Sequence, residues 1–189
     1  MTSCRRLVSV LAVACALATA PRAARATVMV KLAQEELVTQ SDLVVRVVAV
    51  AQTTRWNEDE TRILTLTRLS VREYLKGTGP SELTLRQFGG TLQGMTLRVP
   101  GDGHLRAGEE AVVFLRRGVG VVYLTAMAQS VYEVVPTARG PMVRRDLHDV
   151  EFVAPDARGA LVPSEAPVEP DQELVRFTEA VRATARRTQ

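Results

Sequence analysis

The sequence predicts an all-β protein, folded as an antiparallel barrel or sandwich with one peripheral helix near each end. Short apolar strands recur about every ten residues, and turns rich in glycine and proline separate them. Two stretches depart from this pattern and carry helix-favouring residues instead. These observations place a β-domain over residues 27–153, a proline-rich linker over 154–170 and an amphipathic helix over 171–189.

The first 26 residues are typical of a cleavable secretory signal peptide. Two arginines precede an apolar run over 7–20, and small residues at 24 and 26 mark a cleavage site. The run is shorter than the roughly 20 residues of a membrane anchor, and it continues past Cys15 instead of stopping before a lipid-modified cysteine. We therefore expect Thr27 to begin a secreted or periplasmic protein without stable membrane insertion.

Removal of this leader changes what the composition implies. The leader holds both cysteines and four arginines, so the formal net charge of +3 falls to −1 over the remaining 163 residues. A chain of this length without cysteine depends on one packed apolar core, because disulfides and thiolate metal sites are excluded. The near-neutral charge also argues against a nucleic-acid partner, and we interpret the scattered arginines as solvated strand faces.

The first elements along the chain are a short helix and two long strands. Residues 32–39 favour a helix that Ser41 and Asp42 end. Residues 43–53, LVVRVVAVAQT, are rich in β-branched side chains and predict a strand buried on one face and largely covered on the other. Apolar residues then alternate over 63–74, which predicts a half-buried second strand.

Shorter strands follow, separated by glycine turns. They are predicted near residues 83–86, 96–99, 111–116, 121–126 and 131–135. We interpret Gly89 and Gly90 as barrel-loop positions with positive φ, because no helix opens after them as a phosphate-binding loop requires.

The last segment predicts a helix after the prolines of the linker. Asp171 is expected to cap it, and Leu174, Phe177 and Val181 recur on one face. We interpret this narrow apolar stripe as a surface that packs on the barrel, with a partner-binding tail as the alternative.

Two segments resemble a known family. SDLVVRVVAVAQ at 41–52, followed by TRILTLTRLSVREYLKG at 61–77, resembles the first hairpin of the tissue inhibitors of metalloproteinases. Weaker similarity in the loop at 106–110 and the strand at 112–115 extends the resemblance over about 32–135. Those inhibitors have an OB-fold barrel of the netrin-like type, so the resemblance implies a bacterial secreted protein with an OB-like barrel.

The resemblance also implies a binding site at the N-terminal edge. In those inhibitors a terminal cysteine, pinned by a disulfide, presents its amine and carbonyl to the protease zinc. Here Thr27 stands at the expected terminus, Val28 follows it, and no cysteine remains to hold this end. Trp56, beside the acidic turn, is a further candidate contact residue, with core packing as the alternative.

We therefore expect a non-catalytic binding protein with a protein partner, and the specific hypothesis is a metalloprotease inhibitor or a pro-region-like partner of a secreted metalloprotease. The alternative is an oligosaccharide- or peptide-binding OB module of the cell envelope. That module would show an exposed aromatic cluster around Trp56, Tyr123 or Tyr132.

No motif assigns an enzyme activity, a cofactor or a metal. His104 and His148 are the only histidines, and their spacing from Asp102, Asp146 and Asp149 matches no compact ligand motif. We expect each histidine to lie in a polar loop. A small hydrolase is the least favoured alternative, and it requires the two histidines to converge near carboxylates.

Overall fold

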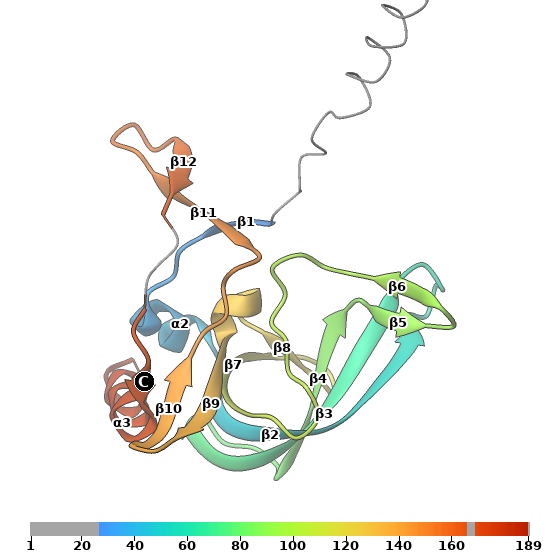
Figure 1. The fold of residues 1–189 in the computed structure, drawn as a ribbon, viewed down its shortest axis with the longest axis horizontal. Coiled ribbons are helices and arrows are strands. Elements are labelled where there is room, and N and C mark those ends of the chain that lie inside the picture. Colours follow the sequence, from blue (N-terminus) through green and yellow to red (C-terminus); the bar gives the residue numbers. More distant parts are fainter. Residues whose placement is uncertain (1–26, 166–168, 189) are drawn as a thin grey trace, which may run out of the picture.

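The computed structural model describes residues 27–165 and 169–188, so the leader expected over 1–26 lies outside the described residues. The described part is mostly β-structure with two α-helices and one 3₁₀ turn (Figure 1). The elements in chain order are β1 (Thr27–Val30), α2 (Gln34–Gln40), β2 (Leu43–Trp56), β3 (Ile63–Lys76), β4 (Glu82–Phe88), β5 (Gly90–Leu92), β6 (Met95–Leu97), β7 (Glu110–Arg117), β8 (Val122–Leu124), η1 (Met127–Ser130), β9 (Val131–Thr137), β10 (Gly140–Arg144), β11 (Val150–Pro155), β12 (Leu161–Ser164), β13 (Gln172–Glu173) and α3 (Leu174–Arg187).

Five strands close into a barrel in the order β2-β3-β4-β8-β7, and β7 pairs with β2 to complete the ring. All neighbours are antiparallel except β4 and β8, which meet in parallel at Leu85 and Val122. This order, in which the last strand lies between the third and the fourth, is that of an OB-like barrel. The predicted all-β class and OB-like architecture with two helices are confirmed.

The long strand β2 contributes to two cores because it bends. Its register against β3 shifts at three points, between Val44 and Val45, Arg46 and Val47, and Ala49 and Ala51. Such irregularities coil a strand and allow a small barrel to close. Val45, Val47 and Ala49 fill the barrel interior, whereas Val44 faces outward under the helices. Burial on both faces explains the nearly continuous apolar run in the sequence.

The two helices pack on the outside of the barrel and form a second core. Phe177 of α3 lies against Tyr132 of β9 and Phe114 of β7, with ring centroids 4.5 and 6.5 Å away. The apolar stripe of α3 is therefore a packing surface (Figure 1). The expected cap at Asp171 is wrong, because residues 172 and 173 pair with β10 as β13 and the helix begins at Leu174. Within the described ranges, no helix is long and apolar enough to cross a membrane.

A separate three-stranded sheet projects from the barrel in the order β1-β11-β12 (Figure 1). Strand β1 runs parallel to β11, with Thr27 opposite Val150 and Val30 opposite Val153. Met29 packs with Phe152 and Val150 in a small satellite core. The β11–β12 hairpin crosses the boundary expected at residue 153, so part of the proline-rich segment is paired strand.

Candidate binding site

A loop at one end of the barrel, residues 101–106, which we call the mouth loop, separates two surface hollows. Its Leu105 is buried among the residues that fill the barrel. Two glutamines fix its backbone: Gln52 of β2 donates to the Leu105 carbonyl over 2.6 Å, and Gln87 of β4 donates to the Gly103 carbonyl over 2.7 Å. Because strands alternate, both glutamines project from the side of their strands that faces the barrel interior. The mouth loop is thus a fixed part of the barrel.

The N-terminal strand is fastened to the start of this loop. The Thr27 hydroxyl donates to the Pro100 carbonyl. Thr27 and Met29 also pack on Gly101, where an added Cβ would lie 3.0 Å from the Thr27 Cβ and 2.8 Å from the Met29 Cε. Gly101 also has a φ of +74°. Glycine therefore suits this position because of both the positive φ and the close approach of β1. The N-terminal edge and the mouth loop therefore form one continuous surface.

A buried glutamine holds the other end of β1. The side chain of Gln129, only 2 % exposed, accepts from the Leu32 amide over 2.9 Å and donates to the Val30 carbonyl over 3.1 Å. Together with the β1–β11 pairing, these contacts position the edge without a disulfide. Val28 remains 56 % exposed on this edge.

The first hollow, of about 200 Å³, receives both histidines. Each histidine lies in a loop, as the sequence predicts, and the fold brings the two loops to the same hollow. His148 lies between two carboxylates, with its Nδ1 2.5 Å from Asp146 and its Nε2 3.2 Å from Asp149. The hydrogen bond and negative charge of Asp146 raise the pKa of His148, and the same hydrogen bond lowers the pKa of Asp146.

The lining of this hollow is acidic. Burial raises the pKa of Asp102, which accepts a hydrogen bond from the Gly103 amide over 2.9 Å. Among the described lining residues there is no serine, threonine or cysteine to attack a substrate. Within the described ranges, no group of three histidine or carboxylate ligands is placed to hold a metal. The two histidines thus line one hollow together with carboxylates.

The second hollow, of about 350 Å³, lies between the β5–β6 hairpin and the mouth loop, and its lining includes several neutral hydrogen-bonding groups. Gly89 and Gly90 fold the hairpin back with φ values of +99° and +122°, which confirms the predicted positive φ. An added Cβ at Gly90 would lie 2.5 Å from the Thr65 hydroxyl, so the hairpin sits directly on β3. The hollow presents amides and hydroxyls from Gln52, Gln87, Thr65, Thr91 and Thr96.

The aromatic residues do not gather at either hollow. Trp56 is half-buried and lines a third hollow of about 190 Å³, so it does not share a site with Thr27 and Val28. Tyr132 is buried in the helix-covered core, and Tyr123 lies half-exposed on β8. The aromatic cluster that we associated with an oligosaccharide-binding module is therefore not formed by these three residues.

Sequence reasoning missed the glutamines that organise the site. A signal for two of them exists: Gln52 closes the apolar run of β2, and Gln87 continues the inward alternation of Leu83 and Leu85. A polar residue in an inward position needs a partner, and here the partner is the mouth-loop backbone. Gln129 has no comparable signal, because it lies in a 3₁₀ turn between strands.

Comparison of this chain with protein-family models, curated proteins and solved structures gives no match.

Proposed function

We propose that this chain is a secreted, non-catalytic binding protein whose N-terminal edge engages a protein partner, and that the partner is a secreted metalloprotease. The observation that supports this most is the fastening of Thr27 to Pro100 and Gly101. A terminal strand that is already ordered loses less conformational freedom on binding than a free terminus does. The exposed side chain of Val28 lies on the same edge and is available to a partner.

The chemistry of the proposed contact needs only backbone groups. After cleavage behind residue 26, Thr27 carries a free α-amine next to its own carbonyl, and the two can chelate one metal ion. A catalytic zinc accepts nitrogen and oxygen ligands and keeps one coordination position open. Any residue left in front of Thr27 converts the amine into an amide and removes the nitrogen ligand. The proposed activity therefore depends on the position of cleavage.

The test compares two forms of the protein that differ only at the terminus. N-terminal sequencing of the exported protein first establishes whether the chain begins at Thr27. A form beginning at Thr27 and a form with one additional glycine before Thr27 are then titrated against a panel of secreted zinc proteases. We expect inhibition by the first form at micromolar or lower concentration, and its loss in the second. A glycine added after Gln189 serves as the matched control.

Two results would contradict the proposal. Absence of inhibition across the panel at micromolar excess would remove the metalloprotease as partner. Equal inhibition by the glycine-extended form would show that the terminal amine is not the contacting group. Pull-down from the native secretome, with Val28→Asp as the comparison, tests the broader proposal of a protein partner, because a buried carboxylate at the interface should abolish capture.

A further inference from the structure

One face of the barrel collects unpaired positive charge. Strand alternation fixes the direction of its side chains: Thr67 and Leu85 are buried, so the residues next to them in β3 and β4 project outward. The helices cover the opposite side of the barrel and leave this face open (Figure 1). We call it the arginine face, and it comprises Arg55, Arg62, Arg68 and Arg86, with Phe88 at one end of its β4 segment and Glu82 at the other.

These four arginines lack the carboxylate partners that some arginines elsewhere on the sheet have. Among the ion pairs within the described ranges, none involves any of the four, whereas Arg46 pairs with Glu110 and Arg144 pairs with Glu133. A guanidinium without a carboxylate keeps its planar set of donors for a ligand. Four such groups on one face provide a stronger attraction for anions than the near-neutral charge of the domain suggests.

The strand register gives the dimensions of the face. Arg55 and Phe88 flank Leu64 on the two sides of β3, and Arg86 lies opposite Leu66. Arg62 and Arg68 are six residues apart in the sequence. In an extended strand this separation corresponds to about 20 Å. The positive charge therefore forms a strip and not a single pocket.

An aromatic surface accompanies the charge. Phe88 is 47 % exposed, and the Arg62 guanidinium lies 5.3 Å from its ring centroid. Trp56 lines the hollow of about 190 Å³ between Arg55 and Arg86. Guanidinium groups bind carboxylate and sulfate through paired hydrogen bonds, and aromatic rings cover the apolar faces of sugars.

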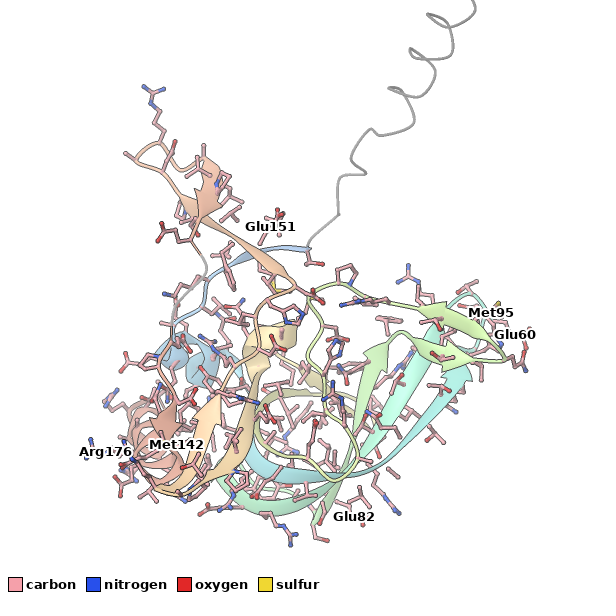
Figure 2. The ribbon with its side chains drawn as sticks, in the orientation of Figure 1. Glu60, Glu82, Met95, Met142, Glu151 and Arg176 are labelled. Atoms are coloured by element: carbon pink, nitrogen blue, oxygen red, sulfur yellow. The ribbon has the colours of Figure 1, made fainter. Side chains whose placement is uncertain are left out.

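We propose that the arginine face binds an acidic polysaccharide, a chain of sugars that bear regularly spaced carboxylate or sulfate groups. A strip of separated guanidiniums suits an extended polymer with separated charges. Single-stranded nucleic acid is disfavoured because it needs several stacking surfaces, and among the described residues of this face Phe88 is the single largely exposed ring. The acidic turn at 57–60, whose Glu60 is labelled in Figure 2, lies between Arg55 and Arg62 in the chain. This proposal is independent of the N-terminal edge.

The test measures binding of the purified protein beginning at Thr27 to two polymers of known chemistry, dextran sulfate and polygalacturonate, by titration calorimetry at two salt concentrations. Neutral dextran is the uncharged reference. We expect binding to at least one acidic polymer, weakened by salt, and no binding to dextran. Arg68→Gln and Arg86→Gln should each weaken binding about tenfold, since each removes a charge-assisted contact. Phe88→Ala should weaken it further, and Glu58→Gln should strengthen it.

Matched controls separate this face from general charge. Arg139→Gln, at the exposed β9–β10 turn, changes net charge equally and should leave binding unchanged. Thermal unfolding of each variant checks the fold, which surface substitutions should leave intact. An equal loss with Arg139→Gln, no binding to either acidic polymer, or tighter binding of single-stranded DNA at the same salt would each overturn the proposal.

Discussion

The carboxylate of Glu169, in the segment before α3, pairs with the guanidinium of Arg145, whose side chain is 1 % exposed. The same guanidinium lies 4.8 Å from the ring centroid of Tyr132 and donates to the Gln129 carbonyl over 3.3 Å. Burial among these groups raises the pKa of the Tyr132 hydroxyl. The pair thus connects the segment that leads into α3 with the aromatic core beneath the helix.

Loss of Arg145 should destabilise the fold strongly. Arg145→Ala removes the cation–π contact and leaves Glu169 without its partner, so we expect the free energy of unfolding to fall by about 3 kcal/mol. Glu169→Gln keeps an acceptor and should cost about 1 kcal/mol. Arg144→Ala, which breaks the exposed pair with Glu133, is the matched control and should cost at most about 1 kcal/mol. Urea denaturation measures all three, and similar losses for Arg144 and Arg145 would contradict the prediction.

The glycine that seats the β5–β6 hairpin should not tolerate a side chain. Gly90→Ala places a Cβ 2.5 Å from the Thr65 hydroxyl and 2.7 Å from the Thr54 methyl, at a φ of +122°. We expect it to lower the free energy of unfolding by about 3 kcal/mol. Gly94→Ala, at φ +80° with no atom within 4 Å, should cost about 1 kcal/mol because only the backbone is strained. Chemical denaturation measures the free energy of unfolding of both variants. Equal losses would show that the contact of the Gly90 position with Thr65 and Thr54 adds nothing to the backbone strain.

Removal of the Gln129 side chain should release β1. Gln129→Ala leaves the Leu32 amide and the Val30 carbonyl without their partners, at a cost of about 2 kcal/mol. Hydrogen exchange should become faster in β1 before other strands are affected. Gln40→Ala, at the exposed end of α2, should change neither quantity. If protection of β1 is unchanged in Gln129→Ala, the pairing with β11 alone holds the edge.

The His148 and Asp146 pair should be sensitive to pH. The pKa of His148 is raised, so its stabilising effect is fully present below the unfolded value of about 6.5 and is lost as the pH rises through the folded pKa. The pKa of Asp146 is lowered, so its effect is present above about 3.9 and is lost as the pH falls through the folded pKa. NMR titration should show a raised His148 pKa that returns toward 6.5 in Asp146→Asn. Asp156→Asn, in the β11–β12 turn, should leave it unchanged.

The barrel was predictable because local pattern and burial agree there. In each of three elements the sequence pattern indicates which face is buried. These patterns are the apolar run from Leu43 in β2, the alternation from Ile63 in β3 and the apolar stripe around Phe177 in α3. The strands of the small sheet were not predicted because their signals are weak. Strand β1 has only four residues, and β12 contains Pro163 in an edge strand, where a missing amide is tolerated.

The site was only partly predictable because contacts distant in sequence create it. His104 and His148 share a hollow through the packing of the mouth loop against the turn before β11, and their local spacing does not encode this. The arginine face arises from three strands whose register aligns Arg68 and Arg86 on one side. Outward arginines in single strands were recognisable, but their common face depends on the closed barrel.

The parallel pairing of β1 with β11 has a consequence for the order of folding. Thr27 meets Val150, a partner 123 residues later in the chain, so β1 leaves the ribosome before its partner has been synthesised. Pairing of such distant segments closes a long loop and is slow compared with hairpin formation. The barrel hairpins should therefore form first, and β1 should join last. A chain caught before that step would hold a complete barrel whose terminal strand is still free to pair with another molecule.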